Sequence, residues 1–509
     1  MKNTYKSFLF GLVVILTACG SPTGVSSGTQ SNADPSSSIS ASETKEGTYH
    51  FYCVNDFHGS ILERNGNNYE AGIAKYFGEL KRLKEKDPEH TVILSAGDMY
   101  QGSLESNSNY GKLITEAMNE VGFEAMTIGN HEFDYGQDKL LENVELANFP
   151  FLAGNIMKYK DGAATTTRWM EDKVGLSTVI EKGDAKIGIV GVIGEGQTTS
   201  ITSKYVSDIT FVGHEELTKN EAARLRSEEG CDIVLLLIHD EMANSRYAAN
   251  KKYFDGVFCA HTHDDECQAI SRVPFVQSFC NGRAMSKIDI TLDGGSAYCS
   301  DYRIINSTSS WEEDEKIAAI RDSYIEDGEF KLKATAKAGY VDGFLAPKEG
   351  VPNIICKAIY EKYAPKEDNL VCTMVNGQRY GLSGGVTFSD IYKATPFMNK
   401  IVIANVKGED IIKEAYYNHT YTGDLENYRT INSSSFYKVA IIDYILCHQG
   451  LNKTYDYFYS LNPGRGGTLL VEYEDYPFDL VFDYIKNDLQ GQVDANDYTD
   501  YSTGFNLYA

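Results

Sequence analysis

Short apolar runs alternate with helical stretches from residue 49 to about residue 290, and this alternation constrains the fold more than any other feature of the chain. Between the runs, apolar residues recur at helical spacing in 72–86, 111–122 and 214–230. Strands that alternate with helices predict an α/β domain built on a parallel or mixed sheet. The strand-like runs lie at 49–54, 90–96, 124–128, 149–156, 185–194, 231–238 and 254–260.

The C-terminal part of the chain predicts a second, smaller domain. The chain has 509 residues, which is too long for one ordinary core, so we expect two domains. A charged stretch at 311–338 predicts a connecting helix, and the sequence after it is rich in Tyr and Asn. We expect a first domain over 48–310, a connecting helix and hinge over 311–340, and an α+β domain over 341–509.

The N-terminus carries an export signal. Lys2 and Lys6 precede an apolar segment at 8–16, and "LTAC" follows at 16–19, so we expect a signal peptide over 1–18. The same four residues resemble a lipoprotein processing site. Cys19 would then be the lipidated first residue of a membrane-anchored protein at the cell surface or in a periplasm. The alternative is a simple signal peptide with an incidental cysteine. Residues 19–47 are rich in Ser, Gly and Thr and predict a flexible tether.

The net charge of the chain limits the classes of partner that it can bind. The formal net charge of −25 argues against a nucleic-acid partner, because phosphate backbones are bound by clustered Lys and Arg. It does not exclude a phosphorylated small molecule, since a bound metal supplies local positive charge.

The 10 cysteines lack C-x-x-C spacing, so we interpret most of them as small buried hydrophobic residues, although an exported protein can carry a disulfide bridge. No feature implies a protein partner.

Five of the apolar runs end in side chains of the types that bind metal ions. Loops at the carboxyl ends of parallel strands gather at one edge of an α/β sheet, where ligands bind. If the backbone stays extended, the pairs 56/58 and 261/263 each project toward one face. Each motif alone is an ordinary surface or core feature, but the ordered set predicts one joint site. Its members are Asp56 and His58; Asp98; Asn130, His131, Glu132 and Asp134; His239 and Asp240; His261 and His263.

This ordered set resembles that of the calcineurin-like metallophosphoesterases. With the second domain, the chain looks like the 5′-nucleotidase family, which includes bacterial periplasmic UDP-sugar hydrolases. The resemblance implies an α/β sandwich of mixed sheets flanked by helices, followed by a smaller α+β substrate-binding domain. It implies that one metal is held by Asp56, His58, Asp98 and His263, and the other by Asp98, Asn130, His239 and His261. Ala260 stands where the family usually has Gly. We expect this change to be tolerated, because it adds only one methyl group.

The resemblance also implies a mechanism. Two divalent ions would activate a water that attacks phosphorus, and the mixed Asp, His and Asn ligands suit Mn, Zn, Co or Fe. His131 matches the catalytic histidine of the family, which stabilises phosphoryl charge or protonates the leaving oxygen, and Asp134 matches its orienting partner. We expect Glu132 to face elsewhere and assign it no role.

Substrate recognition is expected in the second domain. In "RYGLSGGVTFSDIYKATPFMN" (379–399), Arg379 matches a substrate-binding arginine of the family, and Asn376 precedes it. Tyr444 takes the position of an aromatic that stacks on the nucleobase, and Tyr476 or Phe478 is a candidate for a second stacking ring. The stacking face of an aromatic contributes roughly 1–3 kcal/mol per base. The family's G-G-D-G-Y segment is absent after Tyr444, so base recognition diverges from the family here.

These features predict an exported, lipid-anchored phosphoesterase that hydrolyses nucleotides or related phosphoesters. Alternatives within the superfamily are a 2′,3′-cyclic phosphodiesterase, a UDP-sugar hydrolase and a hydrolase of another phosphoester. A different class is a non-catalytic nucleotide-binding surface lipoprotein, against which the complete ligand set argues.

Overall fold

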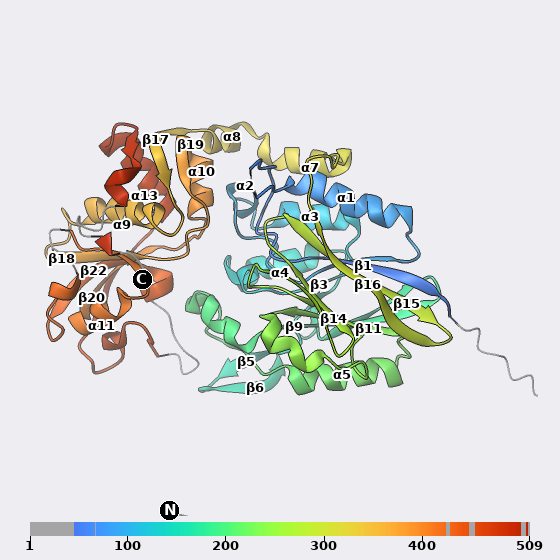
Figure 1. The fold of residues 1–509 in the computed structure, drawn as a ribbon. Coiled ribbons are helices and arrows are strands. Elements are labelled where there is room, and N and C mark those ends of the chain that lie inside the picture. Colours follow the sequence, from blue (N-terminus) through green and yellow to red (C-terminus); the bar gives the residue numbers. More distant parts are fainter. Residues whose placement is uncertain (1–44, 67, 424–427, 447–453, 500–504, 507–509) are drawn as a thin grey trace, which may run out of the picture. The chain divides into compact units, whose positions relative to one another are not determined.

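The computed structural model describes residues 45–66, 68–423, 428–446, 454–499 and 505–506, and residues 44–509 form one compact unit (Figure 1). The expected signal peptide, Cys19 and most of the expected tether lie outside the described residues. Among the described helices, none is long and apolar enough to cross a membrane. Within the described ranges the cysteines are unpaired thiols, and the buried ones are Cys53, Cys231, Cys259, Cys356 and Cys372.

Two mixed sheets of the N-terminal half carry the strands that the sequence predicted. One sheet has the order β16-β15-β1-β2-β3-β4-β7, and the other has the order β13-β14-β12-β11-β9-β8. The strands of the first are β1 (Gly47–Val54), β2 (Thr91–Ser95), β3 (Ala125–Thr127), β4 (Phe151–Leu152), β7 (Val174–Gly175), β15 (Ala284–Asp293) and β16 (Ser296–Asn306). Those of the second are β8 (Ser177–Lys182), β9 (Ala185–Ile193), β11 (Ile233–His239), β12 (Gly256–Cys259), β13 (Asp265–Ile270) and β14 (Val273–Ser278).

Helices and one small sheet complete this half. The small sheet has the order β10-β5-β6, with bounds β5 (Ile156–Lys160), β6 (Ala163–Arg168) and β10 (Ile209–Phe211). The α-helices are α1 (Gly72–Lys86), α2 (Leu104–Asn107), α3 (Lys112–Val121), α4 (Gln137–Leu146), α5 (Glu215–Ser227) and α6 (Met242–Ser245). The 3-10 turns are η1 (His131–Phe133), η2 (Glu195–Ser200), η3 (Ser203–Tyr205) and η4 (Arg246–Ala248).

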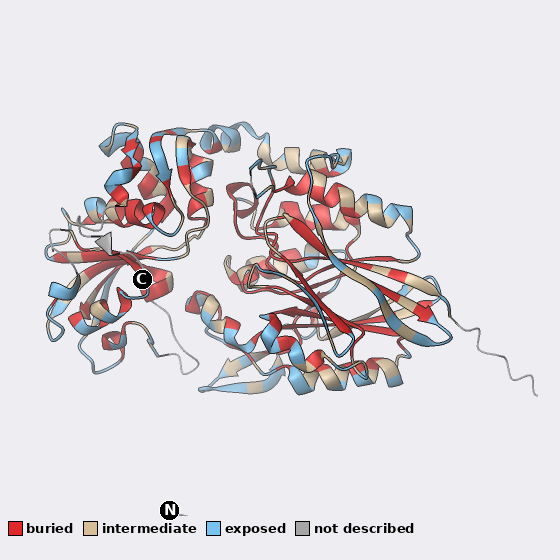
Figure 2. Cartoon of the chain, in the orientation of Figure 1, coloured by how far each residue is buried: buried red, intermediate tan, exposed pale blue. Residues whose placement is uncertain are grey.

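The two large sheets pack face to face, and helices cover their outer faces. In β1, Phe51 joins the core between the sheets while Tyr52 joins the core beneath α1 and α3. In β11, Leu235 lies in the core between the sheets and Leu236 lies in the core beneath α5. Figure 1 shows β11 and α5 on the same side of the sandwich. Because successive strand residues point to opposite faces, a strand buried on both sides needs an unbroken apolar run. The predicted sandwich fold is therefore confirmed, as Figure 2 illustrates by the burial along these strands.

The sequence prediction missed the antiparallel additions to the sandwich. After β12 in the chain, β13 pairs antiparallel with β14, β15 pairs antiparallel with β1, and β16 pairs antiparallel with β15. Parallel pairing runs from β1 through β2, β3 and β4 to β7, and from β9 through β11 and β12 to β14. The ligand-bearing runs therefore end at the carboxyl ends of parallel strands in both sheets.

The connecting segment is two helices rather than the single helix predicted. Helix α7 (Glu315–Ile325) ends before Asp327, whose carboxylate accepts hydrogen bonds from the backbone N–H groups of Glu329 and Phe330 at the start of α8 (Gly328–Ala334). Such an N-cap favours the start of a new helix over continuation of the old one. Ile317 of α7 packs in the core beneath α1, whereas Ala334 of α8 packs in the core of the C-terminal half.

The C-terminal half holds two further sheets, of order β19-β17-β24 and β23-β20-β22-β18-β21-β25. The first contains β17 (Lys337–Leu345), β19 (Leu382–Thr387) and β24 (Gln492–Asp494). The second contains β18 (Leu370–Val375), β20 (Ile401–Lys407), β21 (His419–Tyr421), β22 (Phe436–Ile442), β23 (Thr468–Tyr473) and β25 (Phe505–Asn506). The helices and turns are α9 (Gly350–Tyr363), α10 (Phe388–Ala394), α11 (Gly408–Glu414), α12 (Asp443–Leu446), α13 (Pro477–Asp483), η5 (Tyr428–Thr430), η6 (Tyr459–Leu461), the π-helix η7 (Tyr484–Asp488) and η8 (Ala495–Tyr498).

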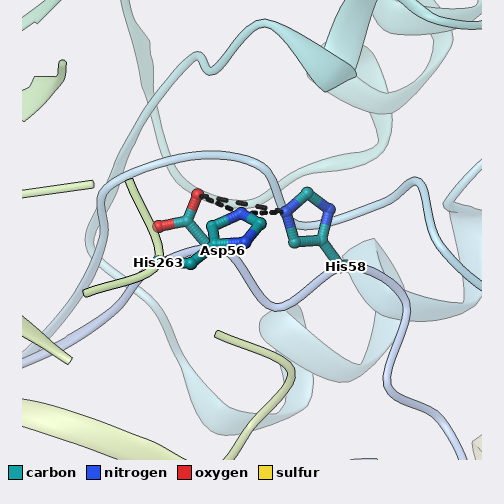
Figure 3. Close-up of side chains that lie close together, drawn as sticks. All are labelled: Asp56, His58 and His263. Carbon is teal, nitrogen blue, oxygen red and sulfur yellow. Dashed lines mark hydrogen bonds and ion pairs between the residues drawn. The ribbon is translucent and has the colours of Figure 1, made fainter. Parts of the chain in front are cut away.

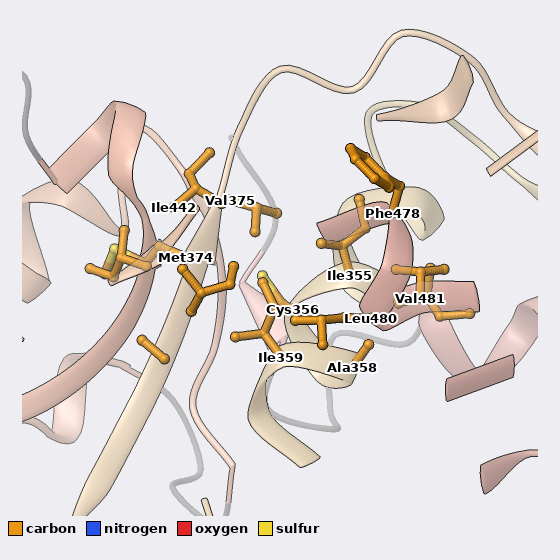
Figure 4. Close-up of a cluster of buried hydrophobic side chains, with 14 of the residues drawn as sticks. Ile355, Cys356, Ala358, Ile359, Met374, Val375, Ile442, Phe478, Leu480 and Val481 are labelled. Atoms are coloured by element: carbon orange, nitrogen blue, oxygen red, sulfur yellow. The ribbon is translucent and has the colours of Figure 1, made fainter. Parts of the chain in front are cut away.

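Helix α9 is the centre of the C-terminal core. Its residues Ile355, Cys356 and Ile359 are buried among Met374 of β18 and Val481 of α13 (Figure 4). This core is separate from the three cores of the N-terminal half, apart from the inclusion of Leu104 from α2. The two halves therefore bury their apolar residues independently.

Candidate metal centre

The predicted ligands lie together at the ends of the strands that carry them. Asp56 and His58 follow β1, Asp98 follows β2 and Asn130 follows β3. His239 is the last residue of β11, while His261 and His263 follow β12. Both sheets thus contribute side chains to one edge of the sandwich, as expected for loops at the carboxyl ends of parallel strands.

The backbone at the pairs 56/58 and 261/263 is left-handed, whereas we expected it to be extended. Five of the ligands have positive φ, which only glycine adopts without strain, and each such residue costs of order 1–3 kcal/mol. Hydrogen bonds between neighbouring loops hold two of them: Asp56 N–H donates to Gly97 O (3.0 Å) and His58 N–H to Asp98 O (3.0 Å). The five φ values are 48° at Asp56, 49° at His58, 55° at Asp98, 80° at His261 and 62° at His263.

One group of three side chains could hold a metal ion: Asp56, His58 and His263. The Nε2 atoms of the two histidines lie 2.9 Å apart, and Asp56 Oδ1 lies 3.6 Å from His263 Nε2 and 4.0 Å from His58 Nε2 (Figure 3). The three side chains converge on one point from two different sheets.

A second group consists of Asp98, His239 and His261. Asp98 Oδ2 lies 3.2 Å from His239 Nε2 and also 3.9 Å from His58 Nε2 of the first group. Asn130 Oδ1 lies 3.0 Å from both His239 Nε2 and His261 Nδ1. Asp98 therefore stands between the two groups. The H-x-H pair is divided, because His261 faces the second group and His263 the first.

The donor atoms fit divalent cations. His58 Nδ1 lies 2.9 Å from Gln101 O, and His239 Nδ1 lies 2.9 Å from Ala96 O. A carbonyl oxygen only accepts, so each Nδ1 carries a proton and each Nε2 faces its group. At His239 burial lowers the pKa, but the Asp98 carboxylate outweighs burial and raises the pKa to about 10, so a metal ion would have to displace a proton from its Nε2. Among the described residues, none donates a hydrogen bond to the buried Asp98 Oδ2. A buried carboxylate oxygen beside imidazole nitrogens is a metal-ligand arrangement.

Burial keeps several of these imidazoles neutral. It lowers the pKa of His261 to about 4 and that of His263 to about 3. Burial also lowers the pKa of His58 well below its usual value. Neutral imidazole is the form that binds metal ions.

His131 has contacts on both ring nitrogens. Its Nδ1 lies 2.8 Å from Asp134 Oδ2, its backbone N–H donates to Asp98 Oδ1 (2.8 Å), and Arg379 Nη2 donates to its Nε2 (3.0 Å). Burial lowers its pKa, but the carboxylates of Asp134 and Asp98 outweigh burial and the Arg379 charge, so its pKa is raised above the ordinary value. The predicted catalytic pair and the predicted arginine are thus in contact.

A cavity of about 270 Å³ opens beside His131. Of the predicted substrate-binding residues, Asn376, Arg379 and Tyr444 line it. The full lining is Asn130, His131, Asp134, Ser200, Thr202, Lys204, Tyr205, His261, Asn376, Gly377, Gln378, Arg379, Phe397, Met398, Asn399 and Tyr444.

The prediction of Phe478 as a stacking ring is wrong, whereas that of Tyr476 stays a prediction. Neither lines the cavity. The Phe478 side chain is buried in the C-terminal core, with ring centroids 4.4 Å from Tyr392 and 5.2 Å from Tyr476. Both residues lie at the start of α13, where apolar residues are needed to pack the helix.

Sequence reasoning missed two aromatic residues of the cavity. The Phe397 ring lies 5.8 Å from the His131 ring, and the Arg379 guanidinium carbon lies 5.4 Å from the Phe397 ring centroid. Phe397 lies in the segment 379–399, which resembles the family's substrate-binding segment, so it could have been predicted from the sequence. Tyr205 lies in η3, and nothing in its local sequence indicates a binding site.

The prediction for Glu132 was wrong. We expected this side chain to face elsewhere, but it is completely buried and accepts three backbone hydrogen bonds from the loops that carry Asp98 and Asn130. Burial, with Asp98 nearby, raises its pKa to about 7. A carboxylate directly after a histidine resembles any loop residue in sequence, so no local signal separates this role from a solvated one.

Comparison with known proteins shows what the chain is similar to. Residues 49–265 match the family model described as calcineurin-like phosphoesterase. An apyrase from Tabanus yao is 32% identical over 220 residues, which are 41% of this chain and 38% of the apyrase. A 5′-nucleotidase from Vibrio cholerae is 22% identical over 419 residues, 70% of this chain and 73% of that protein. The crystal structure of a 5′-nucleotidase precursor from Thermus thermophilus matches with a TM-score of 0.74 and 16% identity, covering 88% of this chain and 97% of the other.

Residues 49–265 therefore match the calcineurin-like phosphoesterases. The chain as a whole is similar to 5′-nucleotidases, since the likeness to the Vibrio protein and to the Thermus fold continues beyond residue 265. The chain spans less than half the length of the Tabanus apyrase and of two further curated relatives, so its likeness to them concerns one part of each.

Proposed function

We propose that this chain is an exported hydrolase that removes phosphate from nucleotides with the help of two divalent metal ions. The observation that carries the proposal is the pair of ligand groups joined by Asp98, directly beside a cavity that both halves of the chain line. The proposed ligands are Asp56, His58, Asp98, Asn130, His239, His261 and His263. These nitrogen and oxygen donors suit Mn, Zn, Co or Fe.

His131, Asp134 and Arg379 supply the remaining chemistry. Bound divalent ions would polarise the phosphoryl oxygens and make water a nucleophile at neutral pH. Asp134 holds Nδ1 of His131, so that Nε2 faces the cavity and can protonate the leaving oxygen. In the described arrangement Nε2 accepts from Arg379. A substrate phosphate offers the guanidinium an anionic acceptor, which frees Nε2 to take up the proton that its raised pKa favours.

The cavity has the features that a nucleoside needs. Phe397 and Tyr444 offer aromatic faces, each of which contributes roughly 1–3 kcal/mol when a base stacks on it. Amide side chains of Asn376, Gln378 and Asn399 line the same space and can donate to and accept from a base edge or a ribose.

Export and lipid anchoring complete the proposal. Export and anchoring are proposed from the sequence of the expected signal peptide over 1–18 and from Cys19, which lie outside the described residues. Labelling of the full chain with radioactive palmitate in a bacterial host tests it. Label that is lost in Cys19→Ser supports the anchor, while equal label in both chains contradicts it.

Two readouts on the full chain, loaded with Mn²⁺, test the activity: release of inorganic phosphate, and chromatography of the organic products. The substrates are AMP, UMP, ATP, UDP-glucose, 2′,3′-cyclic AMP and an aryl phosphodiester. Phosphate release from the monophosphates is the expected result. Cleavage of UDP-glucose to UMP and glucose 1-phosphate alone, or opening of cyclic AMP to a nucleoside monophosphate alone, would replace the nucleotidase by one of the other superfamily activities. Silence with two bound ions would favour a nucleotide-binding lipoprotein without catalysis.

A further inference from the structure

The Glu132 carboxylate bonds the backbones of two ligand-bearing loops at once. Its Oε2 accepts from Asp98 N–H (2.8 Å) and from Gly129 N–H (2.7 Å), and its Oε1 accepts from Met99 N–H (2.7 Å). Asp98 and Met99 lie in the loop after β2, whereas Gly129 lies in the loop after β3. One side chain therefore ties the two loops together through main-chain atoms.

The hydrogen bonds of Glu132 lie in the buried interior and reach a residue whose backbone conformation is strained. The Glu132 side chain is completely buried, so its charge is stabilised by these donors rather than by water. The backbone of Asp98 is left-handed, a conformation that persists only when the surroundings enforce it. A bond to the Asp98 N–H supplies such enforcement at the residue that stands between the two metal groups.

We propose that Glu132 is a positioning residue that holds Asp98 and Asn130 in ligand geometry before any metal ion binds. The inference rests on the proposed metal site, and it concerns the two groups unequally. Glu132 reaches the loops that carry Asp98, which both groups share, and Asn130, which only the second group has, and it contacts none of Asp56, His58 and His263 in the described contacts. The second group should depend on it more than the first.

The variant Glu132→Gln tests this with little change of shape. An amide has one acceptor oxygen and one NH2 donor, so at least one of the three N–H groups must face another donor. Loss of a group that supports ligands typically costs 10–100-fold in metal affinity. We expect the variant to lose about that factor at one of two Mn²⁺ sites and clearly less at the other, which keeps Asp56, His58 and His263 in place.

A matched control separates positioning from general stability. Asp255 is also a buried carboxylate, and it accepts from Val234 N–H (2.9 Å) and Arg226 Nη2 (2.7 Å) away from the metal centre. The full chain, stripped with EDTA, is titrated with Mn²⁺ by calorimetry alongside Glu132→Gln and Asp255→Asn, and each melting temperature is recorded. Asp255→Asn should lower the melting temperature and leave both affinities unchanged.

Each outcome decides a different statement. A loss in Glu132→Gln that is clearly larger at one site than at the other supports the positioning role. Unchanged affinities, or equal loss at both sites with a lower melting temperature, overturns it. If the unsubstituted chain takes up no Mn²⁺, the proposed metal site fails first, and the inference falls with it.

A measurement on the unsubstituted chain covers the case in which Glu132→Gln does not fold. Hydrogen exchange in EDTA reports whether the Asp98, Met99 and Gly129 amides are protected before metal binds. We expect these three amides to exchange at least about a hundredfold more slowly than exposed loop amides, because each donates to a buried acceptor. Exchange as fast as in an exposed loop would refute the claim that Glu132 holds the loops.

Discussion

Asp98 is the side chain on which both ligand groups depend. Its Oδ2 lies 3.2 Å from His239 Nε2 and 3.9 Å from His58 Nε2. Asp98→Ala should therefore reduce metal content below two ions per chain. It should lower phosphate release by more than the roughly 100-fold that loss of a merely supporting group costs. Metal analysis after dialysis, together with phosphate release from AMP, checks both.

His131→Ala provides the contrast. His131 contacts Asp134 and Arg379 through its ring and reaches Asp98 only through its backbone N–H, which the substitution preserves. Turnover should fall roughly 100-fold or more while two ions stay bound, as expected for loss of a general acid. Full metal occupancy in Asp98→Ala, or metal loss in His131→Ala, would contradict the assignment of these two residues.

His419 links folding stability to pH. Burial lowers its pKa from 6.5 to about 4 in the folded chain. Between those values the unfolded chain binds the extra proton, so stability rises with pH through this window and is lost as the pH falls from about 6.5 toward 4. The expected contribution is roughly 2–3 kcal/mol at neutral pH.

Urea unfolding in EDTA at pH 7.5 and pH 4.5 tests this contribution. His419→Gln cannot titrate, so its loss of stability between the two pH values should be smaller than that of the unsubstituted chain by about that amount. EDTA removes the metal-linked titration from both proteins. An identical loss in both would show that His419 is not the group responsible.

Single residues also show where sequence reasoning stops. Asp56, Asp98 and His239 were predictable because each follows an apolar run, and chain order alone places such ends at one edge of a sheet. The left-handed backbone at Asp56 was not predictable, since it results from a hydrogen bond to Gly97 in another loop. Glu132 was missed for the same reason, because two of its three partners are main-chain groups 33 and 34 residues away.

Among structural elements, the loop after β3 leaves no room for a side chain at Gly129. A Cβ there would meet Asp98 Oδ1 and would lie 2.6 Å from Asp98 N and 2.8 Å from His239 Cε1. Gly129→Ala should displace both ligands and weaken Mn²⁺ binding by about 10–100-fold. Gly196, in η2, has nothing within 4 Å of an added Cβ, so Gly196→Ala is the matched control. Equal Mn²⁺ affinities in the two variants would contradict the close packing at Gly129.

The elements were predicted unevenly. Helix α1 has the predicted bounds, 72–86, because its apolar spacing is regular and Asp87 follows its end. The connecting helix was predicted as one segment because its charge pattern continues across Glu326 and Asp327. Only the capping bonds of Asp327, which depend on backbone geometry, divide it. The core position of Phe478 follows from packing against Tyr392, 86 residues earlier in the chain, which local sequence does not reveal.

In the whole molecule, Tyr380 anchors the segment that brings Arg379 to the metal centre. Its hydroxyl donates to Glu70 Oε1 (2.7 Å) and accepts from Asn281 Nδ2 (2.6 Å). The Arg64 guanidinium carbon lies 4.1 Å from the centroid of its ring. All three partners belong to the N-terminal half, and Tyr380 directly follows Arg379. The anchor therefore holds the segment of Arg379, in one half, against residues of the other half.

Tyr380→Ala should impair nucleotides more than small substrates. It removes hydrogen bonds of about 0.5–1.5 kcal/mol each and a cation–π contact of about 0.5–1 kcal/mol, so we expect KM for AMP to rise roughly tenfold. A small aryl phosphate does not occupy the cavity at Phe397 and Tyr444, so its KM should change less. Tyr380→Phe keeps the ring over Arg64 and loses only the hydroxyl bonds, which predicts an intermediate KM for AMP. Equal effects of Tyr380→Ala on both substrates would mean that the anchor stabilises the fold without positioning Arg379, because a general loss of stability does not discriminate between substrates.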